Sequence, residues 1–584
     1  MKTILLELCL CACTLSVVAQ NNTQCPNIIV LLADDQGWGD LSVCGNKMVK
    51  TPHIDRLAAE GASFVNYYVC PVSAPTRAEF LTGRYAYRGQ VTGVSEGRER
   101  LNLDRQTIGD YFKAAGYHTG AFGKWHNGTQ YPYHPNARGF DEFYGYCSGH
   151  WGNYMSPLLE NNGEIVYGEG FLTDDLTNHA ISYIKDHQKE PFFVYLPFNT
   201  PHSPMQVTDK WWNSWKNREL IQCGTNAEKE DQNHTRAALA LAENIDWNVG
   251  RVMQTLKELD IDDNTIVLYF SDNGPNGSRW NGEMKGTKGT TDEGGVRSPL
   301  FIRWPKKIKA GTEIEQLSGC IDLLPTLLSL SGNKTRLGKI DGIDLSECLT
   351  NDIKEVKRTL YRTWGAKSSF REGDYLLSNE LDLYNVREDR SQIKPIQSKE
   401  PLIYQQMLTE KEAFDKESQL ITQAKDTRPF LIAHPMEQYS KLPARDGLCN
   451  GNIKRSNQHP NSSYFTNWIS NRDAIYWDVE VCESGTFEAI VYYTCPNGEE
   501  GSLIRLSSGN IQLVSTLSKA NESSLIGKEL DRVPRQESYM QNFQPFSLGR
   551  ITLSKGKTQI VIEALDVKHN SVMDLYLLVF KRIK

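Results

Sequence analysis

Residues 73 to 84 read S-A-P-T-R-A-E-F-L-T-G-R and combine a hydroxyl nucleophile with a nearby arginine. Pro75 fixes its own φ and disfavours a helical conformation at Ala74, so we expect Ser73 to lie on a loop. The apolar residues at 78, 80 and 81 are spaced to begin a helix, whose first amides would favour an anion beside the serine. Arg77 adds a planar, permanently charged group suited to an oxyanion. The short pattern S-x-P-x-R also occurs at ordinary loop-to-helix junctions, so the stretch needs support from the rest of the chain.

Paired polar residues follow apolar runs elsewhere in the sequence. Residues 27–33 (N-I-I-V-L-L-A) form a continuous apolar run typical of a buried strand, and Asp34 and Asp35 follow it directly. Two adjacent buried carboxylates are costly unless a cation neutralises them. Strand-end or helix-cap carboxylates are the alternative interpretation. A second run, 265–270, ends in the same way at Asp272 and Asn273.

Basic and imidazole groups follow further apolar segments. The run 192–196 leads to His202, and a short predicted strand ends in Lys124 and His126, whose period-two spacing would direct both to one side. Lys288 lies in the glycine-rich, basic segment 285–297. This segment is either an anion-binding loop or a solvated surface loop, and it is not a P-loop.

These side chains require a scaffold that brings several strand ends together. Apolar, β-branched runs alternate with amphipathic helical segments such as 106–115 and 317–330. This alternation predicts a mainly parallel α/β sheet with a site along its carboxyl edge. Residues 360–430 contain short strands and a charged helix beginning at Pro401, which predicts a smaller α+β unit.

Beyond about residue 435 the pattern changes to short alternating strands separated by glycine, serine and asparagine, which predicts a β-sandwich. The run W-D-V-E-V…S-G-T-F-E-A resembles jelly-roll carbohydrate-binding modules, and a purely structural domain is the alternative. Cys482 and Cys495 flank a predicted hairpin and are the best candidates for a disulfide.

Composition bounds the answer further. A chain of 584 residues with 23% charged and 39% apolar residues fits a soluble protein of two or three domains. A formal net charge of −7 argues against nucleic acid as a partner. Residues 1–19 predict a secretory signal, with a loose lipoprotein-like box at Leu10-Cys11-Ala12-Cys13, and no later run is long enough for a transmembrane span.

The run from Ser73 through Leu81-Thr82-Gly83-Arg84 closely resembles the signature of the type I sulfatases, members of the alkaline phosphatase superfamily. In that family a cysteine or serine at the position of Ser73 is oxidised to formylglycine. The serine variant implies an anaerobic, radical-type formylglycine-generating maturase as a partner, and a bacterium living with little oxygen. The resemblance covers roughly residues 25–425. It implies a catalytic α/β domain over 20–335 and a small α+β subdomain over 336–432, followed by the predicted β-sandwich over 433–584.

The resemblance also assigns roles to residues. One Ca2+ per chain would be held by oxygen ligands, a set typical of a hard cation. The family's pattern places these metal ligands at Asp34, Asp35, Asp272, Asn273 and the modified Ser73. The groups around the nucleophile and the sulfate correspond to Arg77, Lys124, His126, His202 and Lys288.

The implied mechanism begins with hydration of the aldehyde at residue 73. One hydroxyl attacks sulfur, His202 or Lys288 protonates the leaving sugar oxygen, and His126 deprotonates the second hydroxyl to expel sulfate. An ordinary serine would be trapped as a stable sulfate ester.

The sequence thus predicts an exported sulfatase, exo-acting on host or algal glycans, in the periplasm or at the cell surface of a Gram-negative bacterium. A lipoprotein is the alternative form of export. A phosphoesterase or phosphonate hydrolase of the same superfamily, and a glycan-binding protein with unoxidised Ser73, are the alternative functions. The sugar and its sulfate position are not predicted; candidate contacts to the sugar are Arg98, Arg100 and His150.

Overall fold

The computed structural model describes residues 25–350, 356–422, 424, 426–522 and 524–583. The predicted export signal at 1–19, including its lipoprotein-like box, lies outside the described residues. Within the described part, no helix combines the length and the apolar character needed to cross a membrane.

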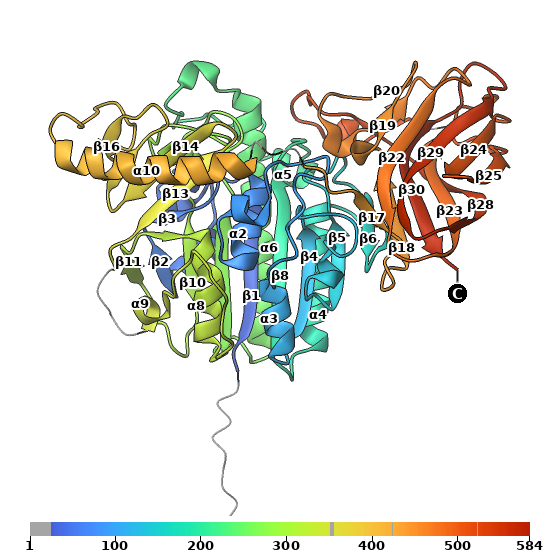
Figure 1. Ribbon diagram of the computed structural model, residues 1–584. Helices are drawn as coiled ribbons and strands as arrows, with labels where there is room; N and C mark the ends of the chain where they lie inside the picture. The colour runs from blue at the N-terminus through green and yellow to red at the C-terminus, as the bar shows by residue number, and fades with distance from the viewer. Residues whose placement is uncertain (1–24, 351–355, 423, 425, 523, 584) are drawn as a thin grey trace, which may run out of the picture.

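A ten-stranded mixed sheet forms the centre of the larger unit among the described residues, in the order β11-β2-β10-β9-β1-β8-β4-β5-β6-β7 (Figure 1). Its five middle strands β9, β1, β8, β4 and β5 are parallel, and the strands toward both edges include antiparallel pairs. The strands are β1 (Asn27–Asp34), β2 (Ala62–Phe64), β4 (His118–Lys124), β5 (Glu142–Tyr146), β6 (Leu158–Asn161), β7 (Glu164–Tyr167), β8 (Phe192–Pro201), β9 (Thr265–Ser271), β10 (Leu300–Arg303) and β11 (Thr312–Ile314).

Helices cover both faces of this sheet because its strands are apolar on both sides. Ile28, Val30 and Leu32 of β1 belong to one apolar cluster, and the alternate residues Ile29 and Leu31 belong to another, as the two-residue period of a strand requires. The first cluster includes α2 (Ser73–Thr82), α3 (Ile108–Ala114), α8 (Leu323–Leu330) and α9 (Ser346–Thr350). The second includes α1 (Pro52–Ala59), α4 (Leu172–Asp186) and α6 (Gln232–Glu258).

Several shorter elements complete the larger unit. The strands β3 (Tyr67–Tyr68) and β12 (Ser318–Gly319) pair in parallel, and the short helices are α5 (Asp209–Trp212) and α7 (Glu293–Val296). A smaller unit follows, with an antiparallel sheet of β13 (Thr359–Trp364), β14 (Lys367–Glu372), β15 (Tyr375–Leu377) and β16 (Leu383–Asn385). The helix α10 (Pro401–Thr422) packs on this sheet through an apolar cluster that contains Phe370 and Met407.

The rest of the chain is a β-sandwich beside the α/β unit (Figure 1). One apolar cluster receives side chains from both of its main sheets. The first sheet contains β17 (Phe430–Ile432), β19 (Leu448–Cys449), β22 (Ala474–Val481), β24 (Leu503–Ser508), β25 (Ile511–Thr516) and β29 (Gly556–Asp566). The second contains β18 (Tyr439–Pro443), β20 (Lys454–Arg455), β21 (Phe465–Thr466), β23 (Gly485–Thr494), β28 (Gln544–Leu553) and β30 (Asp574–Arg582), and β26 (Leu525–Ile526) pairs with β27 (Met540–Gln541).

The predicted fold class, a mixed α/β core with C-terminal all-β sheets, is confirmed. The predicted pairing of Cys482 with Cys495 is wrong, because both cysteines are free. Their strands β22 and β23 belong to different sheets, so the chain between them crosses the sandwich and does not form a hairpin. The two thiols then lie at opposite ends of β23, which spans ten residues.

Candidate active site

Four neighbouring parallel strands end along one edge of the central sheet, and each leads into a predicted site residue. The order β9-β1-β8-β4 aligns their carboxyl ends. Asp34 closes β1 and Lys124 closes β4, whereas Asp272 and His202 directly follow β9 and β8. The alternation of apolar runs and polar ends therefore produces the juxtaposition that the sequence predicts.

Ser73 lies above this edge as the first residue of α2, and not on a preceding loop as predicted. Pro75 does not prevent the helix from beginning at Ser73, because amides in the first helical turn need no intrahelical partner. The buried Ser73 hydroxyl is 2.9 Å from Asp34 Oδ1 and 2.6 Å from Asp272 Oδ2. The Lys124 ammonium donates to Ser73 Oγ over 3.1 Å. Two carboxyl groups and one ammonium group from three strand ends thus meet at this single hydroxyl.

Two buried cations balance the acids beside Ser73. Arg77 donates one N–H to Asp272 Oδ2 over 2.8 Å and another to the backbone carbonyl of Lys124 over 2.8 Å. Lys124 Nζ also donates to Asp34 Oδ2 over 2.7 Å. Burial lowers the pKa of Lys124 despite the neighbouring Asp34. Burial and the nearby Asp34 carboxylate raise the pKa of Asp272 to about 6, because crowded acids resist ionisation.

Asp35 is placed by an unusual backbone conformation, with φ of +65°. Its carboxylate accepts hydrogen bonds from Lys288 Nζ at 2.8 Å and Asn273 Nδ2 at 2.9 Å, and His202 Nε2 lies 3.6 Å away. Burial favours the neutral acid, but His202, Lys288 and Lys124 outweigh it and hold the pKa of Asp35 well below its usual range. Asp35 is therefore ionised.

The oxygen atoms at this edge suit a divalent cation. Oxygens of Asp34 and Asp35 lie within 4.8 Å of one another and of a His202 nitrogen. The Oδ1 atom of Asn273 is buried and has no hydrogen-bond partner in the described part of the chain, as expected of an atom that needs a further ligand. Carboxylate and amide oxygens are the ligands that Ca2+ prefers, and a cation would relieve the crowding of Asp34 with Asp272. The predicted metal residues thus fit such an ion.

The Ser73 side chain lines a cleft. His126, His202 and Lys288 line it, as does His150, one of the predicted sugar contacts. His126 Nε2 lies 3.0 Å from the carbonyl of Val94, and burial with the nearby Lys124 holds the pKa of His126 well below its usual range. The imidazole is therefore neutral.

The other two predicted sugar contacts do not line this cleft. Arg100 is buried and donates to the backbone carbonyls of Gly97, Arg428 and Pro429, which is a structural role. Arg98 is exposed. Sequence reasoning missed five further cleft residues, from the smaller unit and the β-sandwich: Trp364, His459, Asn461, Ser462 and Glu537. They lie about 300 to 460 residues from Ser73 in chain order, in segments without a catalytic motif, so no local signal identified them.

Comparisons with known proteins agree with this geometry. The family model described as sulfatase matches residues 26–333. N-acetylgalactosamine-6-sulfatase from Mus musculus is 33% identical over 376 residues, which cover 58% of this chain and 69% of that enzyme. N-acetylgalactosamine-6-O-sulfatase from Bacteroides thetaiotaomicron is 32% identical over 392 residues, covering 53% of this chain and 73% of that enzyme. The crystal structure of Ps i-CgsB in complex with k-i-k-neocarrahexaose has a TM-score of 0.60 and 30% identity, covering 67% of this chain and 93% of that one.

Proposed function

We propose that this chain, which belongs to the sulfatase family, hydrolyses the sulfate ester of a saccharide. As a member of that family it is a sulfuric ester hydrolase. The observation that carries the proposal is the position of the Ser73 hydroxyl, which contacts Asp34, Asp272 and Lys124 and borders an open cleft. The relatives support a saccharide substrate by their names, since they include sulfatases of N-acetylgalactosamine and a structure with a bound hexaose.

We further propose that Ser73 is oxidised to formylglycine and that Asp34, Asp35, Asp272 and Asn273 hold Ca2+. Once formed and hydrated, this aldehyde would supply one hydroxyl as the nucleophile and a second whose deprotonation would release sulfate, and a cation held by these four residues would supply positive charge for the sulfate oxygens. Oxygens of Asp34 and Asp272 contact the Ser73 hydroxyl, and an Asp35 oxygen lies within 4.8 Å of one from Asp34. The buried Asn273 Oδ1 has no hydrogen-bond partner among the described residues, which also supports the assignment.

The remaining groups position charges and protons. Lys124 contacts the residue 73 side chain directly, Arg77 holds the Asp272 carboxylate beside it, and both cations oppose the negative charge that develops there. The buried Nδ1 of His126 has no hydrogen-bond partner among the residues described, so His126 is placed to accept a proton in the cleft. His202 and Lys288 line the same cleft and are the two candidates to protonate the leaving sugar oxygen.

Export is also part of the proposal, to the periplasm or cell surface of a Gram-negative bacterium, on the strength of the signal-like residues 1–19. Exo action on a chain end is also part of the proposal, with the terminal sugar lying in the cleft that Ser73 lines.

The test is sulfate release from a panel of defined sulfated saccharides. The enzyme is produced together with an anaerobic maturase, and ion chromatography measures sulfate from N-acetylgalactosamine 6-sulfate, sulfated galactans and a parallel phosphomonoester. We expect sulfate from at least one saccharide, and none from the Ser73→Ala variant at an unchanged melting temperature. Full activity of Ser73→Ala, or release of phosphate alone, would refute the proposal.

A further inference from the structure

The β-sandwich contributes side chains to the cleft that contains Ser73. His459, Asn461 and Ser462 come from one of its loops, and Glu537 comes from another. A domain that acted as a separate glycan-binding tail would leave this cleft complete without it. These four residues instead border the space beside the nucleophile, where a substrate has to lie.

The loop that carries Glu537 is held against the segment after β8 by backbone contacts. The amide of Val207 donates to the carbonyl of Leu530 over 3.1 Å, and the amide of Arg532 donates to the carbonyl of Met205 over 3.0 Å. Arg535 Nη1 reaches the carbonyl of Gly152 at 2.6 Å. Backbone pairing of this kind fixes the loop in place, so Glu537 occupies a defined position in the cleft.

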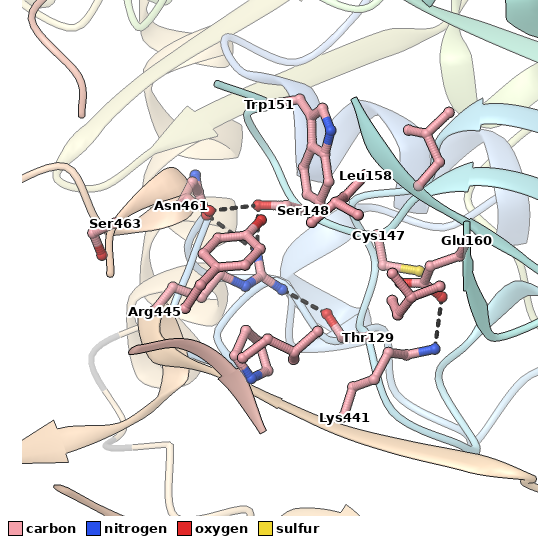
Figure 2. A pocket seen from close by; sticks show the side chains of 15 residues that line it. Thr129, Cys147, Ser148, Trp151, Leu158, Glu160, Lys441, Arg445, Asn461 and Ser463 are labelled. Carbon is pink, nitrogen blue, oxygen red and sulfur yellow. Dashed lines mark hydrogen bonds and ion pairs between the residues drawn. The ribbon is translucent and has the colours of Figure 1, made fainter. Parts of the chain in front are cut away.

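A buried arginine also stabilises the interface between the β-sandwich and the α/β unit beside the cleft (Figure 2). Arg445 of the β-sandwich donates to the hydroxyls of Ser148 at 2.8 Å and Thr129 at 2.6 Å, and to Asn461 Oδ1 at 3.2 Å. Since Asn461 also lines the cleft, this arginine couples the packing of the two domains to the shape of the site.

Glu537 is the acidic residue among the described residues that line the cleft, and the other titratable side chains there are imidazoles and Lys288. Its Oε1 accepts a hydrogen bond from the Ser203 hydroxyl at 2.5 Å and lies 3.6 Å from His150 Nε2. His150 is buried, its Nδ1 lies 2.6 Å from Ser462 Oγ, and its Nε2 has no hydrogen-bond partner within the described ranges. Burial would raise the pKa of Glu537, but His150 and Ser203 outweigh burial and hold that pKa below its usual range, so the side chain is anionic.

A carboxylate in the cleft of an enzyme for anionic substrates has a specific chemical consequence. It accepts hydrogen bonds from hydroxyl or amide N–H groups, and it repels a second sulfate or a carboxylate placed beside it. The sulfate to be removed lies at Ser73, where Arg77, Lys124 and Lys288 supply positive charge. The uncharged part of the sugar is then the part that suits Glu537.

We propose that Glu537 of the β-sandwich, together with His150, is a specificity-determining pair that binds an uncharged hydroxyl or amide group of the substrate sugar and excludes a second anionic group at that position. This inference rests on the proposed saccharide sulfatase function and names its substrate class, a sugar unit with a single sulfate. The β-sandwich is accordingly part of the active site.

Binding to the full chain tests the inference without requiring turnover. Protein with unconverted Ser73, in buffer containing Ca2+, is titrated calorimetrically with inorganic sulfate, N-acetylgalactosamine 6-sulfate and N-acetylgalactosamine 4,6-disulfate. We expect Glu537→Gln to lower the affinity for the monosulfated sugar about tenfold relative to the affinity for inorganic sulfate. The ratio of the affinities for the monosulfated and the disulfated sugar should fall by a similar factor. The matched control is Glu529→Gln, an exposed position in the same loop, which should alter neither ratio.

Thermal unfolding of each variant guards against misfolding. If Glu537→Gln does not fold, Glu537→Asp decides the question, because it keeps the negative charge in the cleft but shortens the side chain by one methylene group. Glu537→Asp should lower the affinity for the monosulfated sugar several-fold relative to the affinity for inorganic sulfate. It should still bind the monosulfated sugar more tightly than the disulfated sugar. A folded Glu537 variant with the same ratio of sugar to sulfate affinity as the wild type would overturn the inference. If the wild-type protein binds inorganic sulfate but neither sugar, the inference is overturned while the sulfate site stands. If it binds none of the three ligands, the proposed function itself is overturned.

Discussion

Replacing Lys441 with methionine should destabilise the docking of the β-sandwich. Lys441 Nζ donates to Glu160 Oε2 over 2.7 Å and to the carbonyl of Gly163 over 3.0 Å, and both side chains of the pair are buried (Figure 2). His134 Nε2 lies 3.1 Å from the same carboxylate oxygen. The substitution removes the ammonium and leaves the Glu160 carboxylate in a buried site.

The expected loss of stability is worked out from the pKa of the Glu160 carboxyl group. Burial would raise its pKa, but Lys441 and His134 outweigh burial and lower that pKa from 4.5 to about 2. This net lowering of the Glu160 pKa, to which Lys441 is the largest favourable contributor, sets the scale of the loss at about 3 kcal/mol of unfolding free energy at pH 7. Breaking a buried ion pair by removing one partner costs about 3–5 kcal/mol in other proteins, which agrees. Because the folded-state pKa is depressed, this stabilisation is complete above about pH 4.5 and is lost as the pH falls toward 2.

Urea denaturation at pH 7 measures the effect, followed by intrinsic tryptophan fluorescence, to which Trp468 and Trp477 in the sandwich core contribute. We expect Lys441→Met to lose about 3 kcal/mol and the double variant Lys441→Met/Glu160→Gln to recover part of that loss. The exposed Lys557→Met in β29 is the control and should stay within about 0.5 kcal/mol of the wild type. A cost below about 1 kcal/mol for Lys441→Met, or a double variant less stable than Lys441→Met alone, would refute the reasoning.

Three further predictions concern the site itself. Arg77→Lys should lower kcat by about 100-fold with little change in melting temperature, because lysine keeps the charge but cannot contact Asp272 and the Lys124 carbonyl together; an unaffected kcat would contradict this role. Removing Ca2+ with a chelator should abolish sulfate release and lower the melting temperature, because a ligand that binds only the folded state stabilises it. Added Ca2+ should restore both, and full activity in the chelator would count against the metal site. Gly123→Ala should destabilise the protein by about 2 kcal/mol or more in chemical denaturation, because φ of Gly123 is +140° and the new methyl carbon would lie 1.9 Å from the carbonyl oxygen of Pro197. Wild-type stability of this variant would show that β4 tolerates a side chain there.

The sequence predicted those parts of the molecule whose signal is local. A buried strand followed by Asp34 and Asp35, and the repetition of that pattern at Asp272, predicted both the sheet and the edge where the site lies. The resemblance around Ser73 predicted which hydroxyl these acids surround.

The remainder depended on information that is not local. Ser73 begins α2 because the first helical turn accommodates Pro75, which the general preference against a helical residue before proline did not anticipate. Cys482 and Cys495 do not pair because the chain crosses between sheets, which alternating strand patterns do not specify. Glu537 reaches the cleft only through the docking of two domains, so no motif around it indicated a role.

The central claim is that Ser73 becomes an aldehyde held beside one divalent ion by acids from separate strand ends. Mass spectrometry of the peptide carrying Ser73, prepared from active enzyme of the native host, tests this claim most directly. We predict a peptide lighter by two hydrogen atoms than the sequence requires. An unmodified serine in fully active enzyme would contradict the account.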